Sequence, residues 1–190
     1  MLLFIDNYDS FTYNLVQLFS IMYSNITVYR HDKITLSDIK KMSPKAIIIS
    51  PGPKEPKDAG ISKEVIKNFY KKIPILGVCL GMQCINECFM GKTIKSPIPV
   101  HGKTSKIYHN QKGLFKNIPS PFKVARYHSL CIEMPKTSPL KVDAQSEDGV
   151  VMAVSHPDYP LFGVQFHPES FLTEYGQKLA KNFLGVISKK

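Results

Sequence analysis

Four short, continuously apolar segments in the first half of the chain most restrict its fold. They cover residues 2–5, 26–29, 46–50 and 75–78. A strand that is apolar at every position, rather than at alternate positions, is typical of a parallel sheet buried on both faces. Helical patterns separate the segments and predict right-handed βαβ crossovers. Functional residues are therefore expected at the carboxyl ends of these strands.

The apolar residues between the segments recur at intervals of three and four, which is the spacing of one helix face. Gly91 is placed to end the fourth of these predicted helices. The four faces comprise Phe11, Leu15, Leu18, Phe19 and Met22; Ile39 and Met42; Ile61, Val65 and Phe69; and Met82, Ile85 and Phe89.

After residue 91 the pattern changes to shorter strand-like segments, separated by turns that contain proline and glycine, such as SPIPVHG and NIPSPF. No internal repeat, linker or low-complexity segment divides the chain. We predict a single domain over residues 1–190 in the α/β class, with a central, mostly parallel sheet flanked by helices and extra antiparallel strands in the second half. The later strands are expected over residues 103–108, 122–127, 142–146, 151–155 and 161–166, and a last helix over about 174–187, with Leu179, Phe183 and Val186 on one face.

The charge of the chain does not indicate a nucleic-acid partner. The formal net charge is +10, but Arg30 and Arg126 are the only arginines and the lysines are scattered, which is typical of a solvated surface. No apolar run approaches the ~20 residues needed to cross a membrane. The first residues lack the basic region and cleavage site of a secretory signal. We expect no nucleic-acid or membrane partner and a mature chain that begins at Met1.

The four cysteines are too few and too irregularly spaced for a disulfide framework, so a reducing compartment is expected. Cys84 and Cys88 lie four residues apart, on one face of a predicted helix. No CxxC pair or nearby histidine completes a ligand set for them. We expect both to be core thiols and the chain to hold no metal.

Cys79 lies in Gly77-Val78-Cys79-Leu80-Gly81, the thiol form of the G-x-S-x-G turn, in which a strand passes directly into a helix and the middle residue is strained and exposed. The helix N-terminus after such a turn stabilises a thiolate. A buried cysteine that closes a core strand fits the same five residues. The pentapeptide alone leaves these two interpretations open.

A cysteine nucleophile needs a base, and His167 is the best placed histidine. Pro168 favours an extended conformation at His167, and in an extended chain Glu169 points to the same side. Glu169 can then orient the imidazole while the second ring nitrogen faces the thiol. His128 in RYHSL is ambiguous, and the remaining histidines are expected to be structural or on the surface: His31, His101, His109 and His156.

Acyl transfer also requires donors for the oxyanion that forms. The backbone N–H of Leu80, directly after the cysteine, is one candidate. The second is expected from Ser50-Pro51-Gly52-Pro53, which follows a predicted strand at the same sheet edge. Gly52 adopts positive φ without penalty and can turn an amide into the site. Taken alone, the same four residues are simply a rigid turn.

ISPGPKEPKDAG, GVCLGMQ and GVQFHPES, in this order, resemble the class I glutamine amidotransferases, and the resemblance covers essentially the whole chain. DNYDSFTYNL and PVHGKTS resemble more selectively the chorismate-using branch, which comprises the glutaminase components of anthranilate synthase and of 4-amino-4-deoxychorismate synthase. The resemblance implies a flavodoxin-like amidotransferase fold. It also implies hydrolysis of glutamine, with the ammonia delivered to a chorismate-binding synthase.

Site roles follow from the resemblance position by position. It assigns Cys79 as nucleophile, His167 as base and then acid, and Glu169 as the orienting carboxylate. Glutamine is expected to be held by Gly52, Pro53, Lys54, Gln83, Ser129 and Leu130. The family usually has glycine at position 54 and histidine at position 82, where this chain has Lys54 and Met82. We expect Lys54 to alter one flank of the glutamine site, because only glycine adopts positive φ cheaply.

The implied partner is the large chorismate-binding subunit, either component I of anthranilate synthase in tryptophan biosynthesis or the aminodeoxychorismate synthase large subunit of the folate pathway, or both. The sequence does not separate these pathways. A γ-glutamyl hydrolase acting alone and a non-catalytic interaction or thiol-sensor protein are further alternatives. No cofactor is expected in this subunit, and magnesium only in the partner synthase. The expected location is the cytoplasm, or the plastid stroma if the chain is organelle-encoded.

Overall fold

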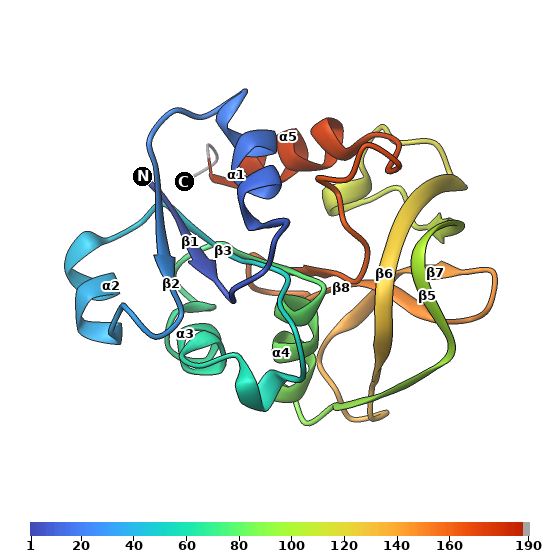
Figure 1. The fold of residues 1–190 in the computed structure, drawn as a ribbon, viewed down its shortest axis with the longest axis horizontal. Helices are drawn as coiled ribbons and strands as arrows, with labels where there is room; N and C mark the ends of the chain where they lie inside the picture. Colours follow the sequence, from blue (N-terminus) through green and yellow to red (C-terminus); the bar gives the residue numbers. More distant parts are fainter. Residues whose placement is uncertain (188–190) are drawn as a thin grey trace.

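The computed structural model describes residues 1–187, and of residues 97–101 only the backbone. The described strands form one sheet in the order β2-β1-β3-β4-β9-β8-β7-β5-β6 (Figure 1). The strands are β1 Leu2–Asp6, β2 Ile26–Arg30, β3 Ala46–Ile49, β4 Ile75–Val78, β5 Lys92–His109, β6 Phe122–Glu133, β7 Lys141–Ser146, β8 Val151–Ser155 and β9 Leu161–Val164. The α-helices are α1 Thr12–Ser20, α2 Leu36–Met42, α3 Ser62–Phe69, α4 Leu80–Cys88 and α5 Gly176–Ile187.

The four strands of the first half form the predicted parallel sheet, and β9, from the second half, joins it in parallel. Strand β1 pairs with β2 and β3, and β4 pairs with β3 and β9, all in parallel. All residues of β1, β3 and β4 are buried, as their continuously apolar sequences predicted. The expectation of a mostly parallel α/β core is therefore confirmed.

Helices cover both faces of the parallel strands and make two apolar cores. On one face Leu15 of α1 and Phe183 of α5 pack with residues such as Phe4 of β1. On the other face α2, α3 and α4 contribute Ile39, Val65, Ile85 and their neighbours. Figure 1 shows this division, with α1 and α5 above the strands and α2, α3 and α4 below. Successive strand residues feed opposite cores because side chains alternate between the two faces.

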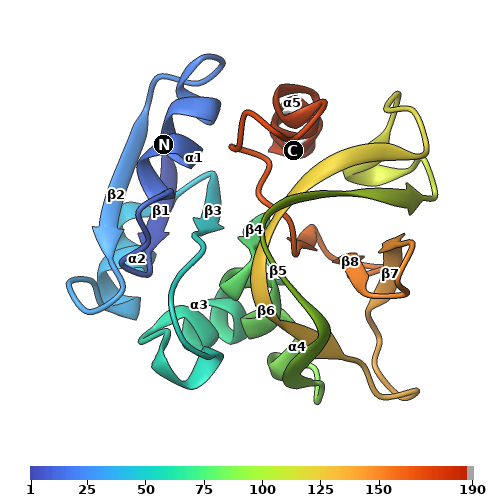
Figure 2. The same ribbon diagram turned by 45° about the vertical axis from the view of Figure 1, so that its right-hand side comes forward.

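The second half differs from the prediction at the SPIPVHG segment. These residues were expected to form a turn, but β5 runs through them from Lys92 to His109. Strand β5 pairs with β7 only at residues 107–109, so most of its length has β6 as its single neighbour. Proline is tolerated in a strand with one free edge, because no ladder hydrogen bond is lost there. Figure 2 shows β5 and β6 as a long curved pair.

Among the other element ends that differ from the prediction, two affect the site. Strand β6 continues to Glu133, six residues beyond the predicted end, so RYHSL lies within a strand. Strand β9 ends at Val164, two residues earlier than expected. Position 167 is therefore not at the strand end but in the loop that follows, and this loop lies close to β6.

The end of α4 shows why Gly91 is a glycine. The residue with positive φ is Met90 (φ 67°), not Gly91. A Cβ atom at Gly91 would lie 2.0 Å from Oδ1 of Asn86. The glycine is therefore required for space rather than for a left-handed conformation.

Candidate active site

Cys79 occupies a strained turn between β4 and α4, as predicted. Its backbone angles are φ 53° and ψ −103°. A Cβ at Gly77 would lie 2.5 Å from the carbonyl oxygen of Gly81, and a Cβ at Gly81 would lie 2.5 Å from that of Ile49. Both glycines are thus needed for strand and helix to meet. Cys79 is less exposed than expected: only 7% of its surface is accessible.

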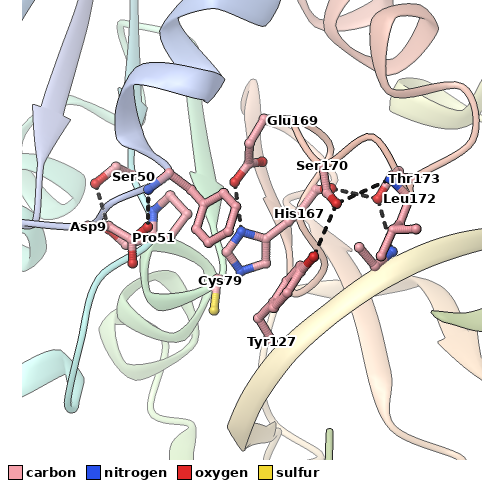
Figure 3. Close-up of polar contacts among 12 residues, drawn as sticks. Asp9, Ser50, Pro51, Cys79, Tyr127, His167, Glu169, Ser170, Leu172 and Thr173 are labelled. Atoms are coloured by element: carbon pink, nitrogen blue, oxygen red, sulfur yellow. Dashed lines mark hydrogen bonds and ion pairs between the residues drawn. The ribbon is translucent and has the colours of Figure 1, made fainter. Parts of the chain in front are cut away.

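His167 and Glu169 form the predicted pair. Nδ1 of His167 donates to Oε1 of Glu169 across 2.7 Å. Nε2 of His167 is buried and has no hydrogen-bond partner among the described residues. Figure 3 shows this ring beside Cys79, with Glu169 on its far side. The three side chains predicted from separate parts of the sequence therefore meet at one place.

The protonation of His167 depends on both neighbours. Burial opposes protonation, but the adjacent sulfur of Cys79 and the carboxylate of Glu169 outweigh it and raise the pKa of His167 well above its usual value. Protonated imidazole beside a thiolate is the arrangement that activates a cysteine nucleophile.

The backbone of His167 is tied to β6. Its N–H donates to the carbonyl of Ala125 across 3.2 Å. Its carbonyl accepts from the hydroxyl of Thr173, and the same Thr173 oxygen accepts from the N–H of Ala125. Because these bonds cross from the loop to the strand, the antiparallel half of the sheet positions the histidine.

A pocket of about 150 Å³ opens next to Cys79. Its walls include all six residues that were expected to hold glutamine, together with two that were not, Tyr127 and His128. The lining residues are Gly52, Pro53, Lys54, Cys79, Gln83, Tyr127, His128, Ser129 and Leu130. A larger groove of about 610 Å³ lies between α2 and α3 and contains none of these residues.

Gly52 and Lys54 differ from expectation in conformation. Among the described residues Gly52 is not one with positive φ, so the reason given for its amide was wrong. A Cβ at Gly52 would lie 2.6 Å from Cβ of Asn7 and from Cδ2 of Leu80, so glycine is required for space. Lys54 itself adopts φ 66°. The turn therefore has the backbone shape expected of the family's glycine, at the cost of strain in a lysine.

The DNYDSF segment supports the proline-glycine turn. The backbone N–H of Asn7 donates to the hydroxyl of Ser50 across 2.9 Å, and its side-chain amide donates to the carbonyl of Ser50 across 3.0 Å. Ser62 of α3 donates to the side-chain oxygen of Asn7. These buried bonds hold the loop after β1 against the loop after β3, which places Gly52 next to Cys79.

Besides His128 on the pocket wall, three residues beside Cys79 and His167 were missed by sequence reasoning. Gln165 is fully buried, and its amide donates to the sulfur of Cys79 across 3.4 Å. The rings of Phe11 and Tyr127 lie against His167, with centroids 5.6 Å and 5.2 Å away. Phe11 was assigned to a core-facing helix surface, but it precedes α1 and faces the site. A polar residue in the apolar run before His167 was the one signal that could have indicated Gln165.

Apart from His128, none of the described side chains of the remaining cysteines and histidines lines the pocket. Cys84 is buried in the core and Cys88 is half-buried against it, as expected. Burial raises the pKa of both thiols, that of Cys88 to about 11. In the part of the chain that the structure describes, no cluster of three His, Cys, Asp or Glu side chains is arranged to hold a metal ion. His31 and His156 contact aromatic rings away from Cys79, His109 stacks on Phe115, and the side chain of His101 lies outside the described residues.

The structure thus combines a strained cysteine turn with a histidine-glutamate pair at one edge of a parallel sheet. This combination is the one expected of a cysteine-dependent acyl-transfer enzyme. Residues 3–186 match the family Glutamine amidotransferase class-I, and the chain belongs to this family. Its fold is that of a protein from Thermoplasma acidophilum that is named for GMP synthase, with a TM-score of 0.89 at 24% identity over 99% of this chain and 94% of that one.

Relatives within the family narrow the comparison. Anthranilate synthase component 2 of Cyanophora paradoxa is 50% identical over 99% of this chain and 100% of its own length. Aminodeoxychorismate/anthranilate synthase component 2 of Bacillus subtilis is 47% identical over 100% of this chain and 98% of its own length. The bifunctional protein TrpGD of Thermotoga maritima is 49% identical over 96% of this chain, which spans only 31% of that longer protein.

Proposed function

We propose that this chain is the glutaminase subunit of an anthranilate synthase. The observation that carries the proposal is the pocket of about 150 Å³ in which Cys79 meets Gly52, Gln83 and the Ser129 region. Its dimensions and polar lining fit a small amino acid. The anthranilate synthase component 2 relatives, matched over nearly their full length, support the choice of reaction.

In the proposed reaction the sulfur of Cys79 attacks the side-chain amide carbon of glutamine. His167, protonated beside the thiolate, gives a proton from Nε2 to the departing nitrogen, which leaves as ammonia. The resulting γ-glutamyl thioester is hydrolysed by water, from which His167 takes a proton, and glutamate is released. Glu169 holds the imidazole orientation throughout by accepting from Nδ1.

Addition of the sulfur to the amide carbon places a negative charge on the amide oxygen, and this oxyanion needs two donors. We assign these to the backbone N–H of Leu80, at the start of α4, and to the turn at Gly52. The first N–H groups of a helix have no partner within it. A Cβ atom placed on Gly52 would lie 2.6 Å from Cδ2 of Leu80, so the two residues are close neighbours.

The partner of this subunit is proposed to be component I of anthranilate synthase, which binds chorismate. Thiolate, imidazole and backbone amides suffice for glutamine hydrolysis, so we propose that no cofactor binds here and that magnesium serves only the partner.

None of the helices among the described residues is long and apolar enough to span a membrane. We propose a location in the cytoplasm or the plastid stroma.

A second candidate uses the same chemistry with a different partner. The Bacillus subtilis relative carries both names, aminodeoxychorismate and anthranilate synthase component 2. The chain can be mixed in turn with component I of each synthase, and the product identified by chromatography. Formation of aminodeoxychorismate alone would replace the anthranilate assignment, and formation of both products would extend it.

The proposal is tested by Cys79→Ala in the complex with anthranilate synthase component I. We expect glutamine-dependent anthranilate formation to vanish, while activity with added ammonium salts stays within about twofold of wild type. Cys88→Ala, which removes a thiol outside the pocket, is the matched control and should retain both activities. Retained glutamine-dependent activity in Cys79→Ala, or equal loss of both activities, contradicts the assignment.

A further inference from the structure

A buried arginine lies directly behind the glutamine pocket. Arg126 on β6 is 1% exposed, and arginine is almost never buried without partners. Its Nη1 donates to Oδ2 of Asp148 across 2.8 Å and to the hydroxyl of Ser105 across 3.2 Å. Its Nε donates to Nε2 of His128 across 3.1 Å. Arg126 therefore links the turn after β7 to a residue of the pocket wall.

This ion pair is poorly explained as a stabilising contact. Burying the charge of Arg126 costs free energy, and attraction to Asp148, whose side chain is 21% exposed, often fails to recover that cost. In addition, Nη2 of Arg126 is buried with no hydrogen-bond partner among the described residues. An arrangement that leaves one donor unsatisfied while it directs another to His128 indicates a positional role for the arginine.

The arginine determines which nitrogen of His128 carries the proton. A guanidinium group only donates, so Nε2 of His128 must accept and the hydrogen of the neutral ring must lie on Nδ1. Nδ1 lies 2.8 Å from the carbonyl oxygen of Leu130 and donates to it. Burial and the charge of Arg126 lower the pKa of His128 to about 4, so the ring is neutral at physiological pH. Through this hydrogen bond, the His128 ring fixes the position of the Leu130 carbonyl.

That backbone lacks regular support from the neighbouring strand. The pairing of β5 with β6 shifts between the pairs Lys95–Leu130 and Val100–His128, where β5 takes more residues than β6 to pass from one pair to the next. The irregularity lies directly opposite Ser129. A side-chain bond from His128 to Leu130 therefore holds a segment that the ladder leaves irregular, and this segment lines the glutamine pocket.

Asp148 anchors the outer end of this series. It lies in the turn between β7 and β8, outside the pocket lining. Burial disfavours its ionised form, but hydrogen bonds from Ser146 and Arg126 outweigh this and lower the pKa of Asp148. It is therefore charged at neutral pH and holds the guanidinium in place.

We propose that Asp148, acting through Arg126 and His128, positions the Ser129–Leu130 backbone that binds glutamine. Asp148 and Arg126 are positioning residues and take no part in bond making. The proposal rests on the proposed glutaminase function and adds to it a remote determinant of glutamine affinity. Loss of Asp148 should weaken binding of the substrate and leave the chemistry at Cys79 intact.

The test uses the full chain and two thiol reagents. A glutamine-analogue electrophile, 6-diazo-5-oxonorleucine, reports binding through its half-saturating concentration and chemistry through its limiting rate of Cys79 modification. Iodoacetamide, which does not need the glutamine site, reports the thiol alone. For Asp148→Ala we expect the half-saturating concentration to rise about tenfold, with the limiting rate and the iodoacetamide rate within about twofold of wild type.

Asp143→Ala is the matched control, because Asp143 on β7 is also a carboxylate that accepts a hydrogen bond, from Asn110, without reaching Arg126. It should bind the analogue as wild type does. Asp148→Asn keeps an acceptor for Arg126 and should restore most of the affinity. If Asp148→Ala does not fold, Asp148→Asn tests the proposal instead. The half-saturating concentration of the analogue is then expected to rise about two- to threefold.

Wild-type affinity in the deciding variant overturns the positioning role, as does an equal fall in the iodoacetamide rate. Absence of saturable labelling of Cys79 in the wild-type chain contradicts the glutaminase function itself. The two failures are therefore distinguishable in one set of measurements.

Discussion

The side-chain amide of Gln165 lies between the nucleophile and the wall of the glutamine pocket. Its nitrogen donates to the sulfur of Cys79 across 3.4 Å, and its oxygen accepts from the amide of Gln83 across 3.3 Å. Gln165 is fully buried, so these bonds satisfy a polar group that has no access to water. The sulfur thus accepts a hydrogen bond from a neutral donor.

Replacing Gln165 with leucine removes the donor to the sulfur while filling a similar volume. We expect kcat/KM for glutamine to fall about fivefold, which corresponds to the ~1 kcal/mol of a typical hydrogen bond. The measurement is glutamine-dependent anthranilate formation by the complex with component I. Gln177→Leu changes an exposed glutamine on α5 and should leave the rate unaltered. A rate for Gln165→Leu within twofold of wild type contradicts the role.

Glu169→Gln removes the carboxylate that orients His167 and helps to raise its pKa. The pKa of His167 should fall, because one of the two groups that favour the protonated ring is neutralised. We expect glutamine-dependent turnover at neutral pH to drop by about a hundredfold or more, and activity with ammonia to persist. The pH dependence of iodoacetamide labelling at Cys79 gives an independent readout. Glu147→Gln, an exposed change, serves as the control, and unchanged labelling in Glu169→Gln contradicts the expectation.

Gly52→Ala places a Cβ 2.6 Å from both Asn7 and Leu80. One of the two loops must move, and we expect a loss of about 1–3 kcal/mol of stability, the usual cost of overpacking. Glutamine-dependent activity should fall more than ammonia-dependent activity, since the displaced backbones border the oxyanion site. Gly185→Ala in α5 meets nothing within 4 Å and should be neutral or slightly stabilising. Chemical denaturation of both variants checks the difference, and equal stabilities would show that the site has room for a side chain.

His128 should make the chain less stable in acid. Its pKa is lowered from 6.5 to about 4 in the folded state, so between these pH values the unfolded chain binds a proton that the folded chain does not. The contribution is present above pH 6.5 and is lost as the pH falls towards 4, to an extent of order 3 kcal/mol. Urea unfolding across this range should show a weaker acid dependence for His128→Gln. An identical pH slope in the variant would mean that folding does not perturb this histidine.

Much of the fold was predictable because the relevant signals are local. Continuously apolar segments such as residues 2–5 and 75–78 predicted buried parallel strands, and the structure confirms them. Turn residues were less informative: SPIPVHG contains two prolines and a glycine, yet it lies in β5. A proline prevents strand pairing only where a neighbouring strand would accept a hydrogen bond from its backbone nitrogen. The sequence does not show which edge of a strand lacks such a neighbour.

Within the candidate site, the residue types were predictable and their connections were not. Cys79, His167 and Glu169 were recognisable because each chemical role allows few side chains at a fixed local spacing. Gln165 and Arg126 act through partners 86 and 22 residues away in the sequence, and such pairs are set by the register of strands. A one-residue change in the register of β6 would turn Arg126 to the other face of the sheet.

The sequence by itself determined that this chain makes a parallel sheet with a cysteine at a tight strand-to-helix turn, because glycine spacing and apolar runs act over a few residues. Only the tertiary structure decided how that cysteine is surrounded. It replaced the expected positive φ at Gly52 with a demand for space, gave Lys54 the left-handed conformation, and placed Asp148 behind the pocket through a buried arginine. The physical reason is that close packing and buried hydrogen bonds depend on which distant segments meet, and this is a property of the assembled sheet.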